Sequence, residues 1–124
     1  MKILKIDSIM FYVKDLNKSA KFYEGIFGLV KAWEDKNYKM IGFKFQDSDS
    51  EIVIHNDKSI PNPDINFLVE NVERFCKEFE RLGYKVVKGP VEVRPGKFAT
   101  VQDIDGNLIN IIDLTRFGNK PKYD

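Results

Sequence analysis

The sequence predicts an α+β fold built from two related modules that face each other across a cleft. Two stretches of the sequence recur at a fixed spacing of 56 positions: residues 11–16 return as residues 67–72, and residues 46–49 return as residues 102–105. Each copy also contains a helical pattern that stops at a glycine. Because each unit spans about half of the chain, the repeat favours two modules and excludes a solenoid.

The first module is expected over residues 3–56. Residues 3–13 are mostly Ile, Leu, Met, Phe, Tyr and Val, which is typical of a strand packed on both faces. Asp15 is a helix N-cap residue, apolar side chains then recur at helical spacing, and Gly28 ends the pattern, so a helix is predicted near residues 16–27. Three extended segments follow it, at residues 29–36, 38–46 and 51–55.

The second module, residues 63–113, repeats this order. Its first strand is predicted at residues 64–70, and Asn71 is the N-cap of a helix over residues 72–82 that Gly83 ends. The extended segments after it are residues 84–88, residues 91–94 with 97–103, and residues 107–113. The predicted order is therefore βαβββ, twice.

The two modules form one domain, residues 1–124, with a short linker and a tail. Residues 60–63 contain two prolines, which continue neither a strand nor a helix, so this segment is the linker. Residues 114–124 are predicted to be a polar tail without periodicity, which Phe117 or Tyr123 could anchor.

The composition restricts the classes of partner. Net charge is +1, so no electrostatic argument favours nucleic acid or an anionic membrane surface. The apolar runs are too short for a membrane helix, and the N-terminus lacks an apolar signal segment, so we expect a cytoplasmic protein. Cys76 is the single cysteine. It lies on the apolar side of the second helix and is expected to be a core residue.

In its motifs the chain resembles the vicinal oxygen chelate superfamily, which includes glyoxalase I, bleomycin-resistance proteins and extradiol dioxygenases. The matching stretches are residues 12–16, Phe22-Tyr23 and residues 27–29, and later residues 103–107. The resemblance implies curled mixed sheets that enclose a cleft. It does not imply one function, because this fold hosts lyases, epimerases, dioxygenases and metal-free binders.

The resemblance also implies positions for a divalent metal, on the first and last strands of each module. These positions map to Ser8 and Asp64 on the first strands, to Asn110 on the last strand, and to either His55 or Val53 in the first module. Hydroxyl and carboxamide oxygens bind zinc, nickel and iron weakly, and the chain has one histidine. We therefore expect no metal cofactor, with Mg²⁺ or Mn²⁺ as the alternative.

The predicted function is metal-independent binding of a small molecule in an aromatic-lined cleft. Asn110 is a polar residue on an otherwise apolar strand, which indicates that it faces a polar cavity. Large aromatic rings suit flat or apolar ligands. The predicted ligand-binding residues are Ser8, Trp33, Phe43, His55, Asp64, Arg94, Phe98 and Asn110.

Two other readings stay open. One is a lyase, isomerase or dioxygenase with an atypical metal site, or with His55 and Asp64 as a metal-free acid/base pair. The other is a protein-interaction module whose function is its dimer interface.

The repeat also generates a prediction about assembly. Two short modules leave strand edges to protect, and twofold dimers are the commonest oligomers. We expect a homodimer in which Trp33 of one chain and Asn110 of the other approach the same pocket. Sedimentation equilibrium at micromolar concentration tests this, and a 14 kDa monomer would contradict it.

Overall fold

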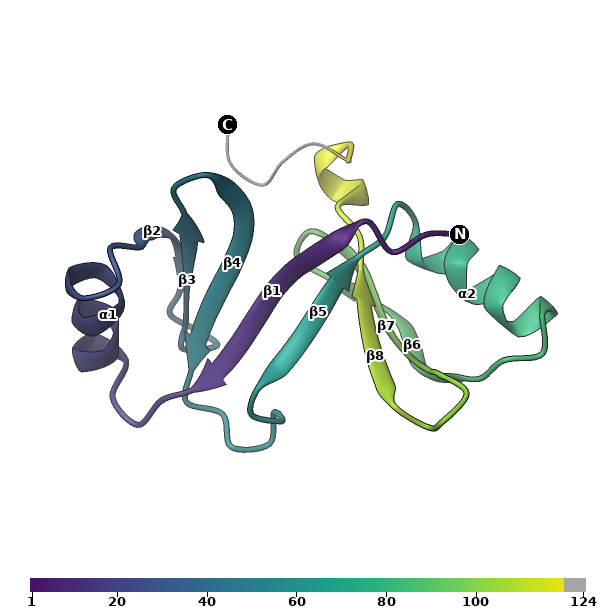
Figure 1. The fold of residues 1–124 in the computed structure, drawn as a ribbon, viewed down its shortest axis with the longest axis horizontal. Coiled ribbons are helices and arrows are strands. Elements are labelled where there is room, and N and C mark those ends of the chain that lie inside the picture. The colour runs from purple at the N-terminus through teal and green to yellow at the C-terminus, as the bar shows by residue number, and fades with distance from the viewer. Residues whose placement is uncertain (120–124) are drawn as a thin grey trace. The chain divides into compact units, whose positions relative to one another are not determined.

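The computed structural model describes residues 1–119 and confirms the predicted order of elements (Figure 1). Each half of the chain contributes a strand, a helix and three further strands. A short 3-10 helix follows the last strand of the second half. The strands are β1 (Lys5–Tyr12), β2 (Val30–Asp35), β3 (Met40–Phe45), β4 (Ser48–His55), β5 (Asp64–Leu68), β6 (Val86–Val93), β7 (Gly96–Gln102) and β8 (Leu108–Ile112). The helices are α1 (Leu16–Gly25), α2 (Val72–Arg81) and η1 (Thr115–Phe117).

The chain divides into two compact units that differ slightly from the predicted modules. The first unit is Ser8–Ile65, and the second comprises Met1–Asp7 with the described residues from Asn66 onward. The N-terminal residues join the second unit because the backbone N–H of Leu4 donates to the carbonyl of Leu68 at 2.8 Å. Of the helices in residues 1–119, none has the length and apolar character needed to cross a bilayer.

The first unit is a mixed sheet covered on one face by α1. Its strand order is β2-β3-β4-β1, with β1 and β4 parallel and the other pairs antiparallel. Helix α1 packs on β3 and β4. The core between helix and sheet contains the buried residues Ala20, Leu29, Ile41, Phe43 and Ile54.

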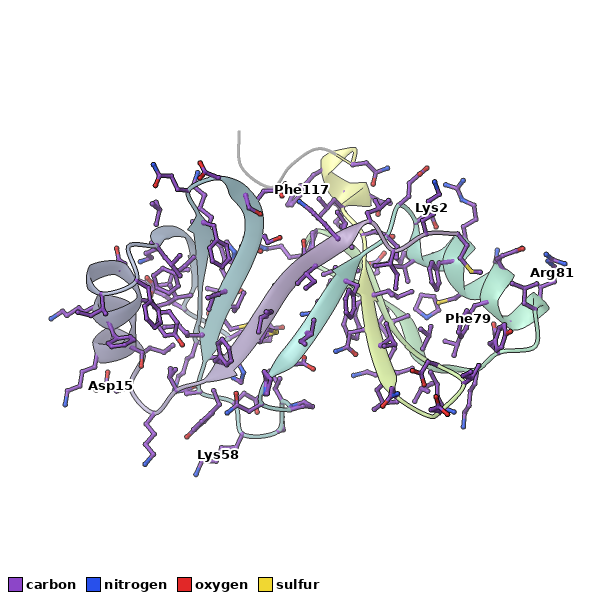
Figure 2. The ribbon with its side chains drawn as sticks, viewed as in Figure 1. Lys2, Asp15, Lys58, Phe79, Arg81 and Phe117 are labelled. Atoms are coloured by element: carbon purple, nitrogen blue, oxygen red, sulfur yellow. The ribbon has the colours of Figure 1, made fainter. Side chains whose placement is uncertain are left out.

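The predicted N-cap of α1 is confirmed, whereas the C-cap residue is Ile26 and Gly28 lies two residues beyond it. Asp15, labelled in Figure 2, lies just before α1. Its side chain accepts a hydrogen bond from the backbone N–H of Lys18 at 3.0 Å, which satisfies one of the free donors of the first turn. Gly28 has φ +69°, a conformation that other residues rarely adopt. The helix itself ends at Gly25, slightly before the predicted residue 27.

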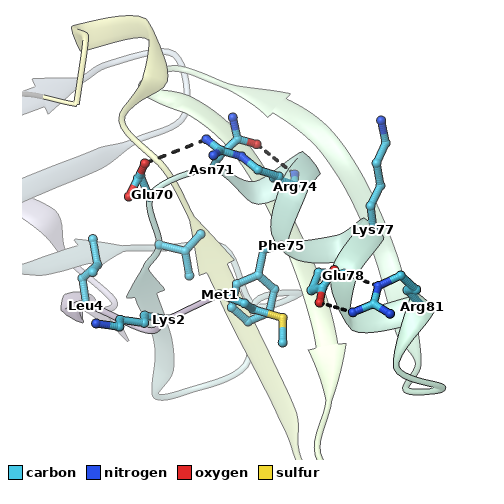
Figure 3. A pocket seen from close by; sticks show the side chains of 11 residues that line it. Met1, Lys2, Leu4, Glu70, Asn71, Arg74, Phe75, Lys77, Glu78 and Arg81 are labelled. Carbon is cyan, nitrogen blue, oxygen red and sulfur yellow. Dashed lines mark hydrogen bonds and ion pairs between the residues drawn. The ribbon is translucent and has the colours of Figure 1, made fainter.

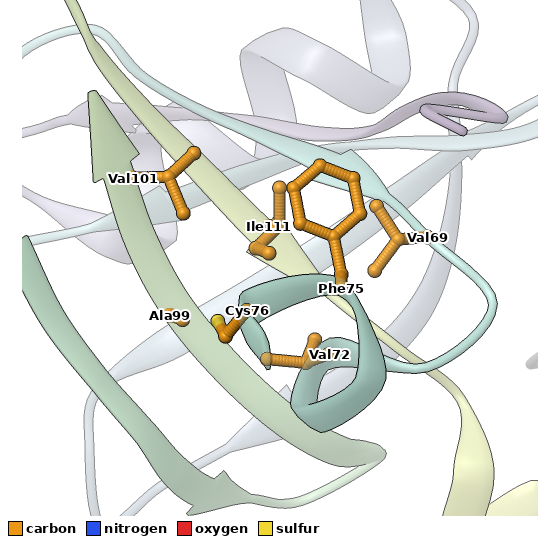
Figure 4. Close-up of a cluster of buried hydrophobic side chains, with 7 residues drawn as sticks. All are labelled: Val69, Val72, Phe75, Cys76, Ala99, Val101 and Ile111. Atoms are coloured by element: carbon orange, nitrogen blue, oxygen red, sulfur yellow. The ribbon is translucent and has the colours of Figure 1, made fainter. Parts of the chain in front are cut away.

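The second unit repeats this arrangement with the strand order β5-β8-β7-β6. Strands β5 and β8 are parallel, and the other pairs are antiparallel. Asn71 caps α2 through the backbone N–H of Arg74 at 2.9 Å, and Gly83 has φ +92°. The core under α2, shown in Figure 4, consists of Val69, Val72, Phe75, Cys76, Ala99, Val101 and Ile111.

Strand β6 differs from the prediction. The segments 84–88 and 91–94 are predicted to be separate, but the single strand β6 (Val86–Val93) covers most of both and pairs with β7 on both sides of Pro90. The register of this pairing shifts between Lys88 and Val91. Proline lacks a backbone N–H, so an edge strand with a bulge is where a strand tolerates it.

The linker and the tail contain more structure than predicted. Asn62 in the linker accepts a hydrogen bond from the backbone N–H of Tyr12 at 3.1 Å, which ties the linker to the end of β1. Part of the tail forms η1, and the Phe117 side chain is 37% exposed, so this residue is only partly covered. The predicted anchor Tyr123 lies outside the described residues.

Asp113 connects four segments of the second unit. Its carboxylate, 1% exposed, accepts hydrogen bonds from the backbone N–H of Val72 (2.7 Å) at the start of α2 and of Lys97 (2.9 Å) on β7. It also accepts from the hydroxyl of Thr115 at 2.8 Å. The Asp113 carboxylate leaves no room for a side chain at position 96, because a Cβ at Gly96 would lie 2.0 Å from Asp113 Oδ1.

We expect Asp113→Ala to lower the free energy of unfolding by about 3–5 kcal/mol, because each buried donor left unsatisfied costs about 1–3 kcal/mol. Chemical denaturation measures this. The matched control is Asp105→Ala, at an exposed acidic residue, which should change the stability by less than about 0.5 kcal/mol. Equal effects of the two substitutions would contradict the role assigned to Asp113.

Candidate functional site

The strands of the first unit separate their side chains onto two faces. Ile52 and Ile54 of β4 pack against the α1 core. Side chains alternate along a strand, so Glu51, Val53 and His55 point to the opposite face, which we call the helix-distal face of the first sheet. The predicted alternatives His55 and Val53 therefore lie on the same face, because they are two residues apart.

Strand β1 contributes its own side chains to the helix-distal face. In the parallel register, Ser8 lies beside Glu51, and Tyr12 lies beside His55. Ser8 and Glu51 are 5% and 2% exposed. This face therefore holds buried polar groups, while the face toward α1 is apolar.

Trp33 lies flat on this face. The residue opposite it on β3 is Gly42, and a Cβ at this glycine would be 2.2 Å from the indole Cε2 and Nε1 atoms. The indole N–H donates a hydrogen bond to the carboxylate of Glu51. The missing side chain at position 42 is thus what lets a large ring rest on the sheet.

His55 is fully buried at the end of β4. Its Nδ1 accepts a hydrogen bond from the backbone N–H of Asp57 at 3.0 Å, which places the proton of the neutral ring on Nε2. Among residues 1–119, no group accepts a hydrogen bond from Nε2. Burial lowers the pKa of this imidazole, although the carboxylates of Asp57 and Asp64 act in the opposite direction.

Other predicted site residues have different positions. Phe43 lies on the α1 side of the sheet, where its ring stacks on Tyr23 with centroids 5.9 Å apart. It is therefore a core residue and not part of the helix-distal face. Phe43 and Trp33 lie on adjacent strands, but their side chains point to opposite faces of the sheet. The register of β2 and β3 shifts between Lys31 and Trp33, so that Trp33 pairs with Gly42 instead of a residue on the face of Phe43.

Three predicted residues belong to the second unit. Asn110 points away from α2, since Ile109 and Ile111 pack toward that helix, and its Oδ1 accepts a hydrogen bond from the Thr100 hydroxyl at 2.9 Å. Phe98 is half-buried on the same face of β7. Arg94 is exposed before the Pro95–Gly96 turn.

Glu51 is a site residue that the sequence reasoning missed. The signal was weak, because Glu51 follows three polar residues and directly precedes the apolar run at residues 52–54, where a buried carboxylate requires partners as Asn110 does. What sequence alone lacked was the register that sets Glu51 beside Ser8 and below the Trp33 indole.

The side chains at the expected metal positions differ in their capacity to bind a metal ion. Within residues 1–119, no three side chains of the types His, Cys, Asp or Glu gather in a geometry that could hold an ion. Of the expected ligand positions on the helix-distal face, Ser8 holds a hydroxyl, and the alternatives His55 and Val53 hold an imidazole and an isopropyl group. The imidazole is the one strong donor among these three, whereas transition-metal sites in proteins use three or four.

Comparisons with known proteins agree with the fold. The family model of the Glyoxalase/Bleomycin resistance protein/Dioxygenase superfamily matches residues 5–111. Virulence protein STM3117 of Salmonella typhimurium is 29% identical over 123 residues, covering 90% of this chain and 85% of that protein.

Solved structures give the same result. Methylmalonyl-CoA epimerase from Mycobacterium tuberculosis has a TM-score of 0.68 at 16% identity, covering 90% of this chain and 88% of the epimerase. A glyoxalase/bleomycin resistance protein/dioxygenase superfamily member from Vibrio splendidus 12B01 has a TM-score of 0.62 at 14% identity, covering 86% of this chain and 96% of that chain. At such identities the likeness shows a shared fold and nothing about the substrate.

The buried imidazole predicts a pH dependence of stability. His55 is the only histidine of the sequence. Below its ordinary pKa of about 6.5, the unfolded chain binds a proton that the folded chain does not bind until a lower pH. The contribution of His55 to the free energy of unfolding is therefore complete above pH 6.5, and it falls as the pH drops below this value.

We expect the NMR titration of His55 to give a pKa below 6.5. The free energy of unfolding between pH 7 and pH 5 should fall more steeply in the parent protein than in His55→Gln, which cannot titrate. A histidine that titrates at or above 6.5 would contradict the burial argument.

Proposed function

Because this chain belongs to the Glyoxalase/Bleomycin resistance protein/Dioxygenase superfamily, we propose that it binds a small molecule, without a metal ion, on the helix-distal face of the first sheet. The main support is the buried Nε2–H of His55. A buried donor without an acceptor is unfavourable by about 1–3 kcal/mol, so an acceptor atom of a ligand would restore a hydrogen bond there.

The neighbouring groups favour a particular class of ligand. The lowered pKa keeps His55 neutral near pH 7, so it donates one hydrogen bond without offering a charge. The Trp33 indole supplies a flat apolar surface whose N–H is already bonded to Glu51. A flat, apolar molecule with a carbonyl or similar acceptor oxygen suits both groups.

The donor chemistry of this face supports independence from metal. Glu51 is its strongest anionic donor, and the Trp33 N–H already bonds this carboxylate. His55 adds one neutral imidazole, and Ser8 and Val53 add no anionic donor. A hydrogen-bonding role for these side chains therefore fits their chemistry better than coordination does.

Flat aromatic ketones, each paired with the hydrocarbon that lacks the carbonyl, test the proposal. We expect ketones to raise the melting temperature and to shift the emission of Trp33, the single tryptophan. His55→Phe keeps an aromatic ring but removes the donor. It should weaken ketone binding about tenfold, the equivalent of one hydrogen bond, and leave hydrocarbon binding unchanged.

Tyr84→Phe is the matched control, because Tyr84 is exposed in the second unit. Equal affinity for ketone and hydrocarbon, or equal loss in both variants, would contradict the proposal. Elemental analysis of protein purified without added metal tests the second part. About one Ni, Zn, Fe or Mn per chain, lost in Asp64→Ala, would overturn metal independence and favour the enzymatic reading.

A further inference from the structure

A hollow lies in the second unit, between the N-terminal segment and α2 (Figure 3). Its volume is about 610 Å³, within the range of small-molecule sites. None of its lining residues belongs to the first unit, so it is separate from the helix-distal face. We call it the α2 groove.

The floor of the α2 groove is apolar. Val69 and Phe75 are 2% and 9% exposed and belong to the core beneath it. Leu4 and Met1, on the N-terminal segment, line the groove and are 53% and 58% exposed. Two large apolar side chains thus remain in contact with water beside a buried core, and an apolar ligand body would remove that surface from water.

The rim of the groove is mainly cationic. Arg74, Lys77 and Arg81 line it from α2 at spacings of three and four residues, which places them along one side of the helix. Lys2 adds a fourth cation from the N-terminal segment. Two acidic residues, Glu70 and Glu78, also line the groove, so four positive and two negative charges leave a net charge of +2.

The two acids do not neutralise the cations equally. Glu78 accepts hydrogen bonds from both Nε and Nη2 of Arg81, with the Nε bond at 3.0 Å, so this pair is closely joined. Glu70 lies 3.8 Å from the Arg74 guanidinium, and both side chains are more than 70% exposed, which makes this pair weak. Lys2, Arg74 and Lys77 are therefore the cations of the rim that neither acid pairs closely.

We propose that the α2 groove binds an amphipathic organic anion, with its apolar body on Phe75 and Leu4 and its carboxylate or sulfonate near Arg74 and Lys77. The apolar floor disfavours a small inorganic anion, which would leave that surface wet. The net positive rim disfavours an apolar cation. This inference goes beyond the proposed function and does not depend on it.

Three probes of equal chain length test the proposal: octanoate, 1-octanol and octylammonium. Titration of ¹⁵N-labelled protein should show that octanoate shifts the amide signals of α2 and residues 2–4, with a dissociation constant at least tenfold below that of either other probe. Arg74→Glu/Lys77→Glu should raise the octanoate constant at least tenfold and improve octylammonium binding. Both residues are exposed, and circular dichroism checks that the variant folds.

Lys85→Glu is the matched control, because Lys85 is an exposed cation outside the groove, and it should change neither constant by more than about twofold. Arg74→Gln is the milder second variant. Three results would overturn the proposal: octanol binding as tightly as octanoate, charge reversal without effect, or amide shifts outside the groove. The His55→Phe variant should bind octanoate normally, so failure of the proposed function is distinguishable from failure here.

Discussion

The period-two alternation of the strands is the constraint on which the rest of the structure depends. Each sheet has one helix on one face, and each helix requires apolar partners such as Ile54 under α1 or Ile111 under α2. The residues between these partners face the other way by geometry alone. Polar residues that would destabilise the core, such as Glu51 and Asn110, are accommodated there. The face to which we assign the ligand site thus arises from the same pattern that makes the core.

The two units share a local motif and use it differently. Asp57 accepts hydrogen bonds from the backbone N–H and the hydroxyl of Ser59, and Asp113 accepts from the same two groups of Thr115. Asp57 is exposed and its second role is to fix the His55 tautomer through its backbone N–H. Asp113 is buried and also bonds two other segments. In the first unit the motif therefore positions the candidate site residue His55, and in the second unit it stabilises the fold through Asp113.

The sequence was sufficient to predict features that depend on residues close together in the chain. The caps at Asp15 and Asn71 were correct because each bonds a backbone N–H three positions later. Residues whose position depends on strand register were harder to place. Phe43 was assigned to the ligand site, yet it pairs with Ile52 of β4 and lies with it on the α1 face of the sheet. Gly42 is informative in hindsight, because a glycine inside an apolar strand indicates that another group, here Trp33, approaches closely.

The two proposed sites rely on different physical chemistry, which makes them separable. The helix-distal face offers a buried neutral donor, and a hydrogen bond from a neutral group responds little to ionic strength. The α2 groove relies on exposed cations such as Lys77, whose attraction for an anion is screened within about 8 Å at physiological salt. Salt therefore weakens a ligand of the groove far more than one held by His55. For a ligand whose binding site is unknown, the salt dependence of its affinity therefore distinguishes the α2 groove from the helix-distal face.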